Sequence, residues 1–220
     1  MKCPIGNGGF VECLDIFGDD LTVVNAARVS FAKESTELSL RDEKLITYLA
    51  RHNHNSPFFH PQIRMRLRMP IFVAREWFRH TVGFARNEVS RRYVDEEPEC
   101  WIPTELRERD ANLKQGSRES VVASNEVLCA SIKAHTETTI QLYNTLLSQK
   151  VAPEVARLVL PQSMYTEFIE TASLAAYARL CGLRLDPHAQ KEIQDFAAAV
   201  SEVLSAKFPI SWKALTTKYE

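Results

Sequence analysis

The sequence predicts one α+β domain spanning residues 1–220, in which a mixed or antiparallel sheet is flanked by long helices. Three observations carry this prediction. Apolar and charged residues alternate strictly from Gln62 to Met69, with the period of a half-buried strand. Helical periodicity dominates the chain after Ser117. A length of 220 residues with 45% hydrophobic content is enough to bury one sizeable core.

A strand and two helices are expected first. Phe10–Ile16 alternates loosely and stops at Gly18-Asp19-Asp20, a turn whose aspartates are candidate N-caps for a helix over Leu21–Val29. Apolar residues at helical spacing predict a second helix over Arg41–Arg51, before Ser56-Pro57 interrupts the pattern.

The alternating strand follows, with Arg64, Arg66 and Arg68 on one face. Charges at every second position are typical of the solvent side of an antiparallel strand, so we interpret these arginines as structural. Pro70 then opens a helix that reaches His80, because the missing N–H of proline costs little at a first helical position. Residues 96–116 are polar and irregular, which indicates a surface excursion within one domain.

The second half of the chain is predicted to be helical. After the excursion, apolar residues recur at helical spacing almost to the end. The expected helices cover Ser117–Leu147, Pro153–Leu160, Thr171–Leu180 and Pro187–Phe208.

Composition excludes several classes of protein. With a formal net charge of -1, the protein surface lacks the overall positive potential that nucleic-acid-binding proteins use. The five cysteines include no C-x-x-C pair, which favours reduced thiols. No signal-peptide core precedes the first strand, and no apolar run approaches the roughly 18 residues of a membrane span. We therefore expect a cytoplasmic protein that binds neither membrane nor nucleic acid.

An unusual density of arginines follows the helix that begins at Pro70. The segment from residue 79 to residue 92 contains four arginines, Arg79, Arg86, Arg91 and Arg92, together with His80 and Ser90. Guanidinium groups bind phosphate through paired hydrogen bonds, and a serine hydroxyl can complete such a cradle. The segment therefore predicts an anion site. The rival interpretation is a structural salt-bridge knot with Glu76 and Glu88.

Three further groups are weaker candidates. Arg157 is the only charge inside an apolar helical stretch, so it either snorkels, pairs or reaches a phosphate. Arg184 to Gln190 forms a polar turn that leads into a helix, where donors could face an anion or a uracil edge. His52, His54 and His60 lack a neighbouring Asp, Glu or Cys that would complete a ligand set, so no metal is expected.

The ordered set of motifs resembles the flavin-dependent thymidylate synthases, and the resemblance covers nearly the whole chain. That family carries Arg-His-Arg, seven residues, Ser and then Gly-Arg-Tyr; here the pattern is Arg79-His80-Thr81, eight residues, then Ser90-Arg91-Arg92-Tyr93. Supporting segments in family order are Asp20–Phe31, His54–Phe58, Pro70–Arg75, Arg157–Pro161 and Leu183–Gln190.

The resemblance implies the thymidylate synthase-complementing protein fold. It also implies a homotetramer with sites shared between subunits, FAD as hydride carrier, and reductive methylation of dUMP to dTMP with NADPH and 5,10-methylenetetrahydrofolate. No cysteine nucleophile is used. An arginine at the position of Arg184 would be catalytic, since it would stabilise the uracil as an N3 anion.

The same resemblance assigns residues to ligands. FAD would be bound by Ser56, Arg79, His80, Thr81, Glu88, Ser173 and Arg179, and dUMP by Glu76, Arg79, Glu88, Ser90, Arg91, Arg92, Arg157 and Arg184. His54, Tyr93 and His188 would lie near folate or FAD.

The chain departs from the family pattern at four places, one of which is that Ser173 and Arg179 replace asparagines of many members. Thr81 replaces the third signature arginine, so a charged flavin contact is either weakened or supplied by Arg86. The additional residue between Thr81 and Asn87 is expected to bulge out. Glu76 stands where glutamine is frequent, and its carboxylate could accept from the amino group of cytosine.

Three functions remain open from the sequence. The first is thymidylate synthesis. The second keeps the fold and FAD but methylates or hydroxymethylates another pyrimidine nucleotide such as dCMP. The third is a non-catalytic nucleic-acid binder that uses Arg64 to Arg92 as a basic face, and the near-neutral net charge argues against it.

Overall fold

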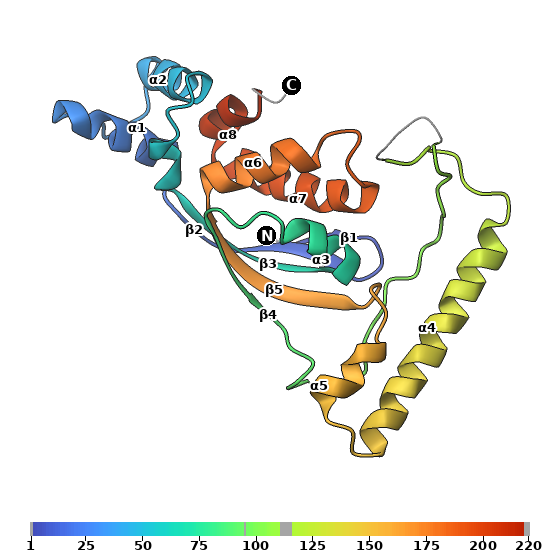
Figure 1. Cartoon of the computed structure of the whole chain (residues 1–220). Helices are drawn as coiled ribbons and strands as arrows, with labels where there is room; N and C mark the ends of the chain where they lie inside the picture. The colour runs from blue at the N-terminus through green and yellow to red at the C-terminus, as the bar shows by residue number, and fades with distance from the viewer. Residues whose placement is uncertain (1, 95, 111–115, 218–220) are drawn as a thin grey trace.

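The fold is organised around a five-stranded antiparallel sheet in the order β1-β2-β3-β5-β4 (Figure 1). The computed structural model describes residues 2–94, 96–110 and 116–217. Every strand pairs antiparallel with its neighbour, so the α+β prediction is confirmed and the sheet has no parallel part. The strands are β1 Lys2–Ile5, β2 Gly9–Phe17, β3 Gln62–Pro70, β4 Phe84–Glu88 and β5 Tyr165–Ser173.

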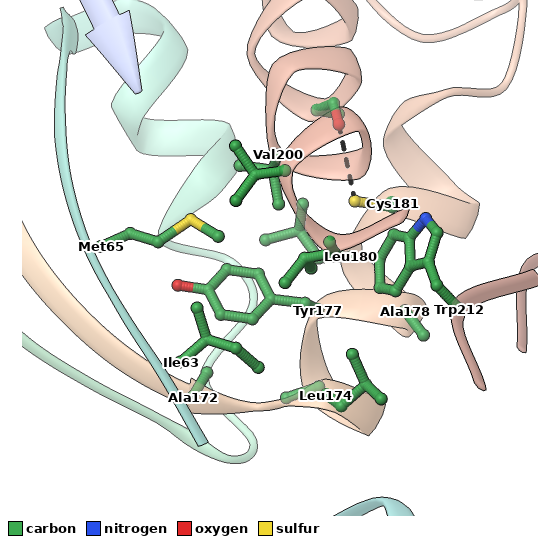
Figure 2. Packing of buried hydrophobic residues seen from close by; sticks show 14 of the residues in the cluster. Ile63, Met65, Ala172, Leu174, Tyr177, Ala178, Leu180, Cys181, Val200 and Trp212 are labelled. Atoms are coloured by element: carbon green, nitrogen blue, oxygen red, sulfur yellow. Dashed lines mark hydrogen bonds between the residues drawn. The ribbon is translucent and has the colours of Figure 1, made fainter. Parts of the chain in front are cut away.

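One face of the sheet is buried beneath two helices, α6 (Leu174–Arg184) and α7 (Lys191–Lys207). The inward residues of β3, including Ile63, have no exposed surface, as the alternation predicts. Figure 2 shows Tyr177 of α6 packed between Ile63 of the sheet and Val200 of α7. The site segments therefore rest on a rigid core.

The other face of β3 carries charge, and each arginine has an acidic partner. Arg64 lies 3.4 Å from Asp15, Arg66 2.5 Å from Glu167, and Arg68 2.9 Å from Glu99. The structural interpretation of these arginines is confirmed.

A second group of helices lies at one end of the sheet. α1 (Asp20–Arg28) is preceded by its N-cap residue Asp19, which forms a capping box with Thr22. The prediction of an aspartate N-cap is therefore confirmed. α2 (Leu40–Arg51) packs against α8 (Pro209–Thr216), and the short helices η1 (Val29–Phe31) and η2 (Ser56–Phe59) complete the group. The buried carboxylate of Asp20 accepts from the backbone N–H groups of Ile210 and Ser211, which ties α1 to the start of α8.

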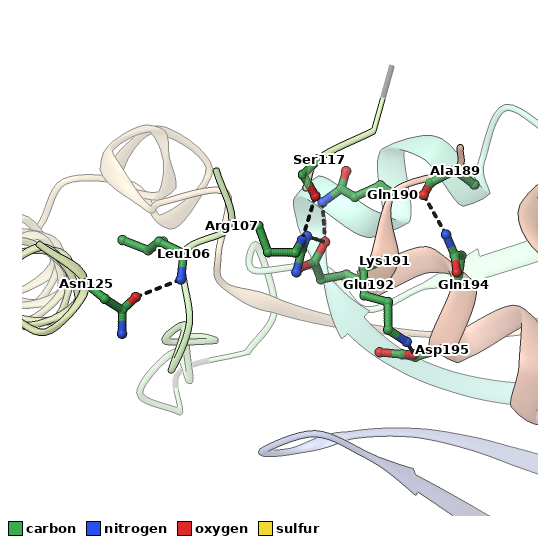
Figure 3. Close-up of polar contacts among 10 residues, drawn as sticks. All are labelled: Leu106, Arg107, Ser117, Asn125, Ala189, Gln190, Lys191, Glu192, Gln194 and Asp195. Carbon is green, nitrogen blue, oxygen red and sulfur yellow. Dashed lines mark hydrogen bonds and ion pairs between the residues drawn. The ribbon is translucent and has the colours of Figure 1, made fainter. Parts of the chain in front are cut away.

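The long helix α4 (Asn125–Ser148) stands away from the sheet (Figure 1). It packs against α5 (Pro153–Ala156) and η3 (Arg157–Val159). An extended segment leads to it from β4, and Arg107 fastens this segment to α7 by donating from Nη2 to both oxygens of Glu192 at 2.7 and 2.9 Å (Figure 3). Ser117 and Gln190 join the same contact. In the described part of the chain, no helix has the length and apolar content to cross a membrane.

Several predicted boundaries are wrong. Thr171–Ser173 belong to β5, not to a helix, and α6 begins at Leu174. The helix expected from Ser117 begins at Asn125, and the one expected from Pro187 begins at Lys191. The helix after Pro70, α3 (Ile71–Trp77), ends before His80. The strands β1, β4 and β5 were not predicted.

Candidate functional site

The signature segment runs from the end of α3 through a turn into β4. All five residues of β4 pair with β5 in an unbroken register from Phe84–Ala172 to Glu88–Phe168. The expected bulge is therefore wrong for residues 84–88. The chain turns sharply before this strand, where Gly83 has a φ of +82° and a Cβ would lie 3.2 Å from the Ala176 methyl.

Arg184 contacts both ends of the segment 76–80. Its Nε donates to His80 Nε2 at 3.0 Å, and its Nη2 donates to the Glu76 carbonyl at 3.1 Å. Nη1 lies 3.3 Å from the Glu76 carboxylate. Residues separated by more than a hundred positions thus form one cluster.

His80 is held in its neutral form. Burial, followed by the nearby guanidinium groups of Arg184, Arg86 and Arg179, lowers the pKa of His80 from 6.5 to about 4. A neutral imidazole whose Nε2 accepts from Arg184 carries its proton on Nδ1.

The Arg184 cluster opens into a cleft of about 750 Å³, called here the Arg184 cleft. Four arginines line it, from α3, the turn after α3, the extended segment and α6, and Glu76 is the one carboxylate among its described lining residues. Such a lining favours an anionic ligand. The lining residues are Arg75, Glu76, Arg79, Arg107, Gly116, Ser117, Arg184, His188, Ala189 and Gln190.

A second cavity, of about 650 Å³, is called here the Arg91 cavity. In the part of the chain that the structure describes, its charged lining residues are three arginines, Arg68, Arg91 and Arg157, and six glutamates, Glu88, Glu96, Glu97, Glu99, Glu154 and Glu167. Arg157 is exposed, and within the described ranges its one hydrogen-bond partner is the Glu154 carbonyl, at 3.3 Å. Thr166 donates to Glu88 at 2.6 Å, which fixes one carboxylate oxygen. The predicted phosphate-binding residues Arg91 and Arg157 are therefore brought together.

Ser90 and Arg92 lie beside this cavity. The Ser90 hydroxyl accepts from the backbone N–H and the Nε of Arg92, both at 3.3 Å, and the Arg92 guanidinium lies 5.0 Å from the ring centroid of the exposed Tyr93. Arg91 donates to the Glu96 carbonyl. The serine and both arginines thus form one local cradle.

The salt-bridge knot that rivalled the anion site is largely absent. Among the described residues, Arg79, Arg91 and Arg92 have no carboxylate within ion-pair distance. Guanidinium groups without an ion-pair partner keep donors available for an external anion.

Arg86 differs from the other arginines of the cluster. Its side chain is 14% exposed and its Nε lies 2.6 Å from the fully buried Glu170 carboxylate, so its charge is engaged inside the protein. The expectation that Arg86 replaces the missing flavin contact of Thr81 therefore has no support in its orientation.

The residues expected near the flavin adenine side gather around α6. Asn55 and Phe59, which flank Ser56, line a pocket of about 210 Å³ with Arg179. Arg179 also donates to the Val82 carbonyl at 2.6 Å, beside the exposed Thr81. Ser173 is buried and caps α6 by accepting from the Ala176 N–H. Its side chain is therefore poorly accessible for the expected contact with FAD.

The two outlying histidines are exposed. His54 meets Tyr48 edge to face, at 6.0 Å between ring centroids, and His188 pairs with Asp186 at 2.9 Å at the rim of the Arg184 cleft. In the part of the chain that the structure describes, no three His, Cys, Asp or Glu side chains gather as a metal site.

The sequence interpretation missed Glu170 and Arg107. Glu170 lies on an unpredicted strand, and Arg107 lies in the segment interpreted as a surface excursion, yet it lines the Arg184 cleft. Glu170 lies opposite Arg86 in the pairing of β4 with β5, so its contact with Arg86 could be predicted only once both strands and their register were known.

Comparisons with known proteins identify the family of this chain. Residues 13–210 match the family model described as thymidylate synthase complementing protein. A flavin-dependent thymidylate synthase of Kosmotoga olearia is 39% identical over 217 residues, covering 97% of this chain and 93% of that protein. A protein of the same name from Thermus thermophilus is 39% identical over 214 residues, covering 97% of this chain and 78% of that protein.

Solved structures of similar fold include a UMP/dUMP methylase, PolB, from Streptomyces cacaoi. The form bound to 5-Br dUMP has a TM-score of 0.84 and 31% identity and covers 95% of both chains. The form bound to 5-Br UMP has a TM-score of 0.84 and 29% identity, covering 95% of this chain and 94% of that one. By the match to the family model and the identity to these relatives, the chain belongs to the thymidylate synthase complementing protein family, whose similar members are named flavin-dependent thymidylate synthases.

Proposed function

We propose that this protein is a flavin-dependent thymidylate synthase that converts dUMP to dTMP with 5,10-methylenetetrahydrofolate and NADPH. The observation that carries the proposal is the Arg184 cluster, in which an arginine from α6 and a neutral histidine of the signature segment meet at a cationic cleft. Family membership supplies the reaction class.

The nucleotide phosphate is assigned to the cradle of Ser90, Arg91 and Arg92, with Arg157 from η3. Hydroxyl, guanidinium and backbone N–H donors satisfy a phosphate better than a carboxylate does, because each phosphate oxygen accepts several bonds. The absence of ion pairs on Arg91 and Arg92 among the described residues leaves these donors available.

The pyrimidine is assigned to the Arg184 cleft, with Glu76 and Arg79 towards the sugar. Arg184 would stabilise negative charge on the uracil ring, because a guanidinium fixed by Glu76 and His80 is preorganised for that charge. Neutral His80 adds no competing positive charge of its own and holds Arg184 in place by accepting its Nε–H.

The residues around α6 and the signature turn fit FAD in chemistry. Arg79 and Arg179 offer cations for a diphosphate, while Ser56, His80, Thr81 and Glu88 offer polar contacts at the turn and beside it. The pocket beside Arg179, at about 210 Å³, takes only a part of such a cofactor. When bound, FAD would supply the hydride that the reaction needs.

We further propose that a homotetramer completes the site. The Arg184 cleft and the Arg91 cavity have no lining residue in common among the described residues, although both are assigned to one nucleotide. Contributions from two copies of the chain would join a phosphate cradle of one to a pyrimidine cleft of the other.

A cytosine nucleotide is less well supported as the substrate. That alternative depended on a free carboxylate at Glu76, and Arg184 engages this carboxylate at 3.3 Å. Uracil nucleotides are favoured, in keeping with the uracil ligands that name the two PolB structures.

The test combines a spectrum with a substrate comparison. The purified protein, reconstituted with FAD, should show a flavin absorption band, and should convert dUMP to dTMP with NADPH and 5,10-methylenetetrahydrofolate. UMP and dCMP are run in parallel. No flavin binding, or methylation of dCMP in preference to uracil nucleotides, would overturn the proposal; strongly salt-dependent oligonucleotide binding without flavin would point to the nucleic-acid alternative.

A further inference from the structure

A buried ion pair lies beneath the turn that carries His80. Glu170 on β5 has no exposed surface, and Arg86 on β4 is its register partner across the sheet. Arg86 Nε donates to Glu170 Oε2 at 2.6 Å, while Trp77 Nε1 and Tyr177 OH donate to Oε1 at 3.1 Å each. Burying charges carries a desolvation cost that apolar residues of similar volume avoid, so stability alone does not explain the pair.

The other end of Arg86 bonds the signature segment. Its Nη1 donates to the His80 carbonyl at 2.6 Å. On the side-chain side, His80 accepts from Arg184 at 3.0 Å. Glu170, Arg86, His80 and Arg184 thus form a continuous series of hydrogen bonds from the core to the Arg184 cleft. The first two do not line that cleft.

The charge on Glu170 is what lets Arg86 occupy this place. A guanidinium with 14% exposure needs a counter-charge, and Glu170 is the carboxylate that the structure places against it. Arg86 also packs over the Phe84 ring at 4.5 Å, which restricts its movement. Arg179 fastens the same turn at the Val82 carbonyl.

We infer that Arg86 and Glu170 are positioning residues: their ion pair fixes the His80 backbone so that the imidazole meets Arg184 and orients its guanidinium at the cleft. The geometric part depends only on the contacts above, and the catalytic consequence rests on the proposed function. Arg86 thereby has a role beneath the turn, distinct from a contact with flavin.

The test uses a charge-neutral double variant, Arg86→Met with Glu170→Gln. Glutamine keeps polar atoms for Trp77 and Tyr177, and methionine replaces the guanidinium by an apolar chain, so no buried charge is left alone. The variant also removes the Arg86 guanidinium, one of the charges that lower the pKa of His80, so a rise in that pKa is interpreted together with the change in kcat. The control is Asp15→Asn, which removes an exposed ion pair with Arg64 on the same sheet.

Three measurements are made on each variant: thermal unfolding, NMR titration of His80 in the ligand-free protein, and kcat and KM for dUMP. The double variant should unfold cooperatively near the wild-type temperature. Release of His80 from its buried place should raise its pKa from about 4 towards 6.5. The groups facing the imidazole are Arg184, Arg86 and Arg179, with Glu76 behind Arg184.

The kinetic expectation is a fall in kcat of about 10- to 100-fold with KM for dUMP within about threefold, because a small misplacement of a reacting group is costly whereas the phosphate cradle is untouched. A folded double variant that keeps a His80 pKa near 4 and wild-type kcat overturns the inference. Should the double variant fail to fold, Arg86→Lys replaces it: one ammonium cannot bridge Glu170 and His80, so kcat should fall, and wild-type kcat would refute the role.

Failure of the proposed function gives a different pattern. A wild-type protein that neither binds flavin nor methylates dUMP refutes that proposal, while the His80 titration still tests the ion pair without any ligand.

Discussion

Replacing Arg184 by alanine tests the centre of the proposed site. The substitution removes three contacts: a hydrogen bond to His80 at 3.0 Å, one to the Glu76 carbonyl at 3.1 Å and an ion pair with Glu76 at 3.3 Å. The side chain is 21% exposed and Glu76 34%, so solvent screens the ion pair and its loss costs at most about 1 kcal/mol. Adding the two hydrogen bonds gives a stability loss of about 2–3 kcal/mol. The variant should remain folded.

Catalysis should suffer far more than stability. A guanidinium facing a charge that develops in the reaction contributes about as much as an oxyanion-hole donor, so kcat should fall by about 10²- to 10³-fold. Because Arg184 also lowers the pKa of His80, its removal should raise that pKa.

The assay measures dTMP formation from dUMP at saturating substrates, with kcat and KM determined separately. Arg184→Lys keeps the charge but loses the planar fork, so it should retain activity between alanine and wild type. Arg41→Ala, at an exposed position of α2, serves as a matched control that should be unaffected. A folded Arg184→Ala variant whose kcat stays within about threefold of wild type would refute the assigned role.

Three other perturbations probe the phosphate cradle, the buried histidine and the helix contacts. Arg92→Ala should raise KM for dUMP about tenfold and leave kcat nearly unchanged, because a phosphate contact binds ground and transition states alike; an unchanged KM would count against the cradle. Since His80 binds fewer protons when folded, with a pKa of about 4 against 6.5 unfolded, its contribution to stability is complete above pH 6.5 and is lost as pH falls towards 4. The loss is about 1–2 kcal/mol after allowance for solvent screening, and denaturant unfolding across that range should show it in wild type and not in His80→Gln. Asp20→Ala removes two backbone contacts at the start of α8 and should cost about 2 kcal/mol, seen as a melting temperature lower by about 4–8 °C, whereas a shift under about 1 °C would contradict the tie between α1 and α8.

The strand β3 shows where sequence patterns suffice. Its apolar and polar residues alternate along eight positions, from Gln62 to Met69, because one face meets the core and the other meets paired acidic groups. This local contrast can be recognised in the sequence without knowledge of the neighbouring strands. β5 has the same two-residue period, but the polarity of its residues does not reveal it. Its inward side carries Thr166 and Glu170 beside Phe168 and Ala172, so two of these four inward positions are polar.

The same difference between local and long-range information decided which site residues could be predicted. The family motifs, including Arg79, Ser90 and Arg184, are short stretches whose chemistry is legible in order, and comparison with relatives agrees with the family they indicate. The role of Arg86 was not legible, since its partner lies 84 positions away. A charged residue in a sequence carries no mark of whether it faces solvent, a ligand or a buried counter-charge.

The sequence by itself determined the family and the α+β class and predicted the candidate anion-binding residues, because these depend on local periodicity and on residue chemistry in a fixed order. Only the tertiary structure decided which charges are available. It placed Arg91 with Arg157, placed Arg184 on His80, and withdrew Arg86 into the core against Glu170. The physical reason is that burial and pairing are set by strand register and helix packing, and a guanidinium becomes a ligand donor or a structural brace according to the partner that packing brings within about 3 Å.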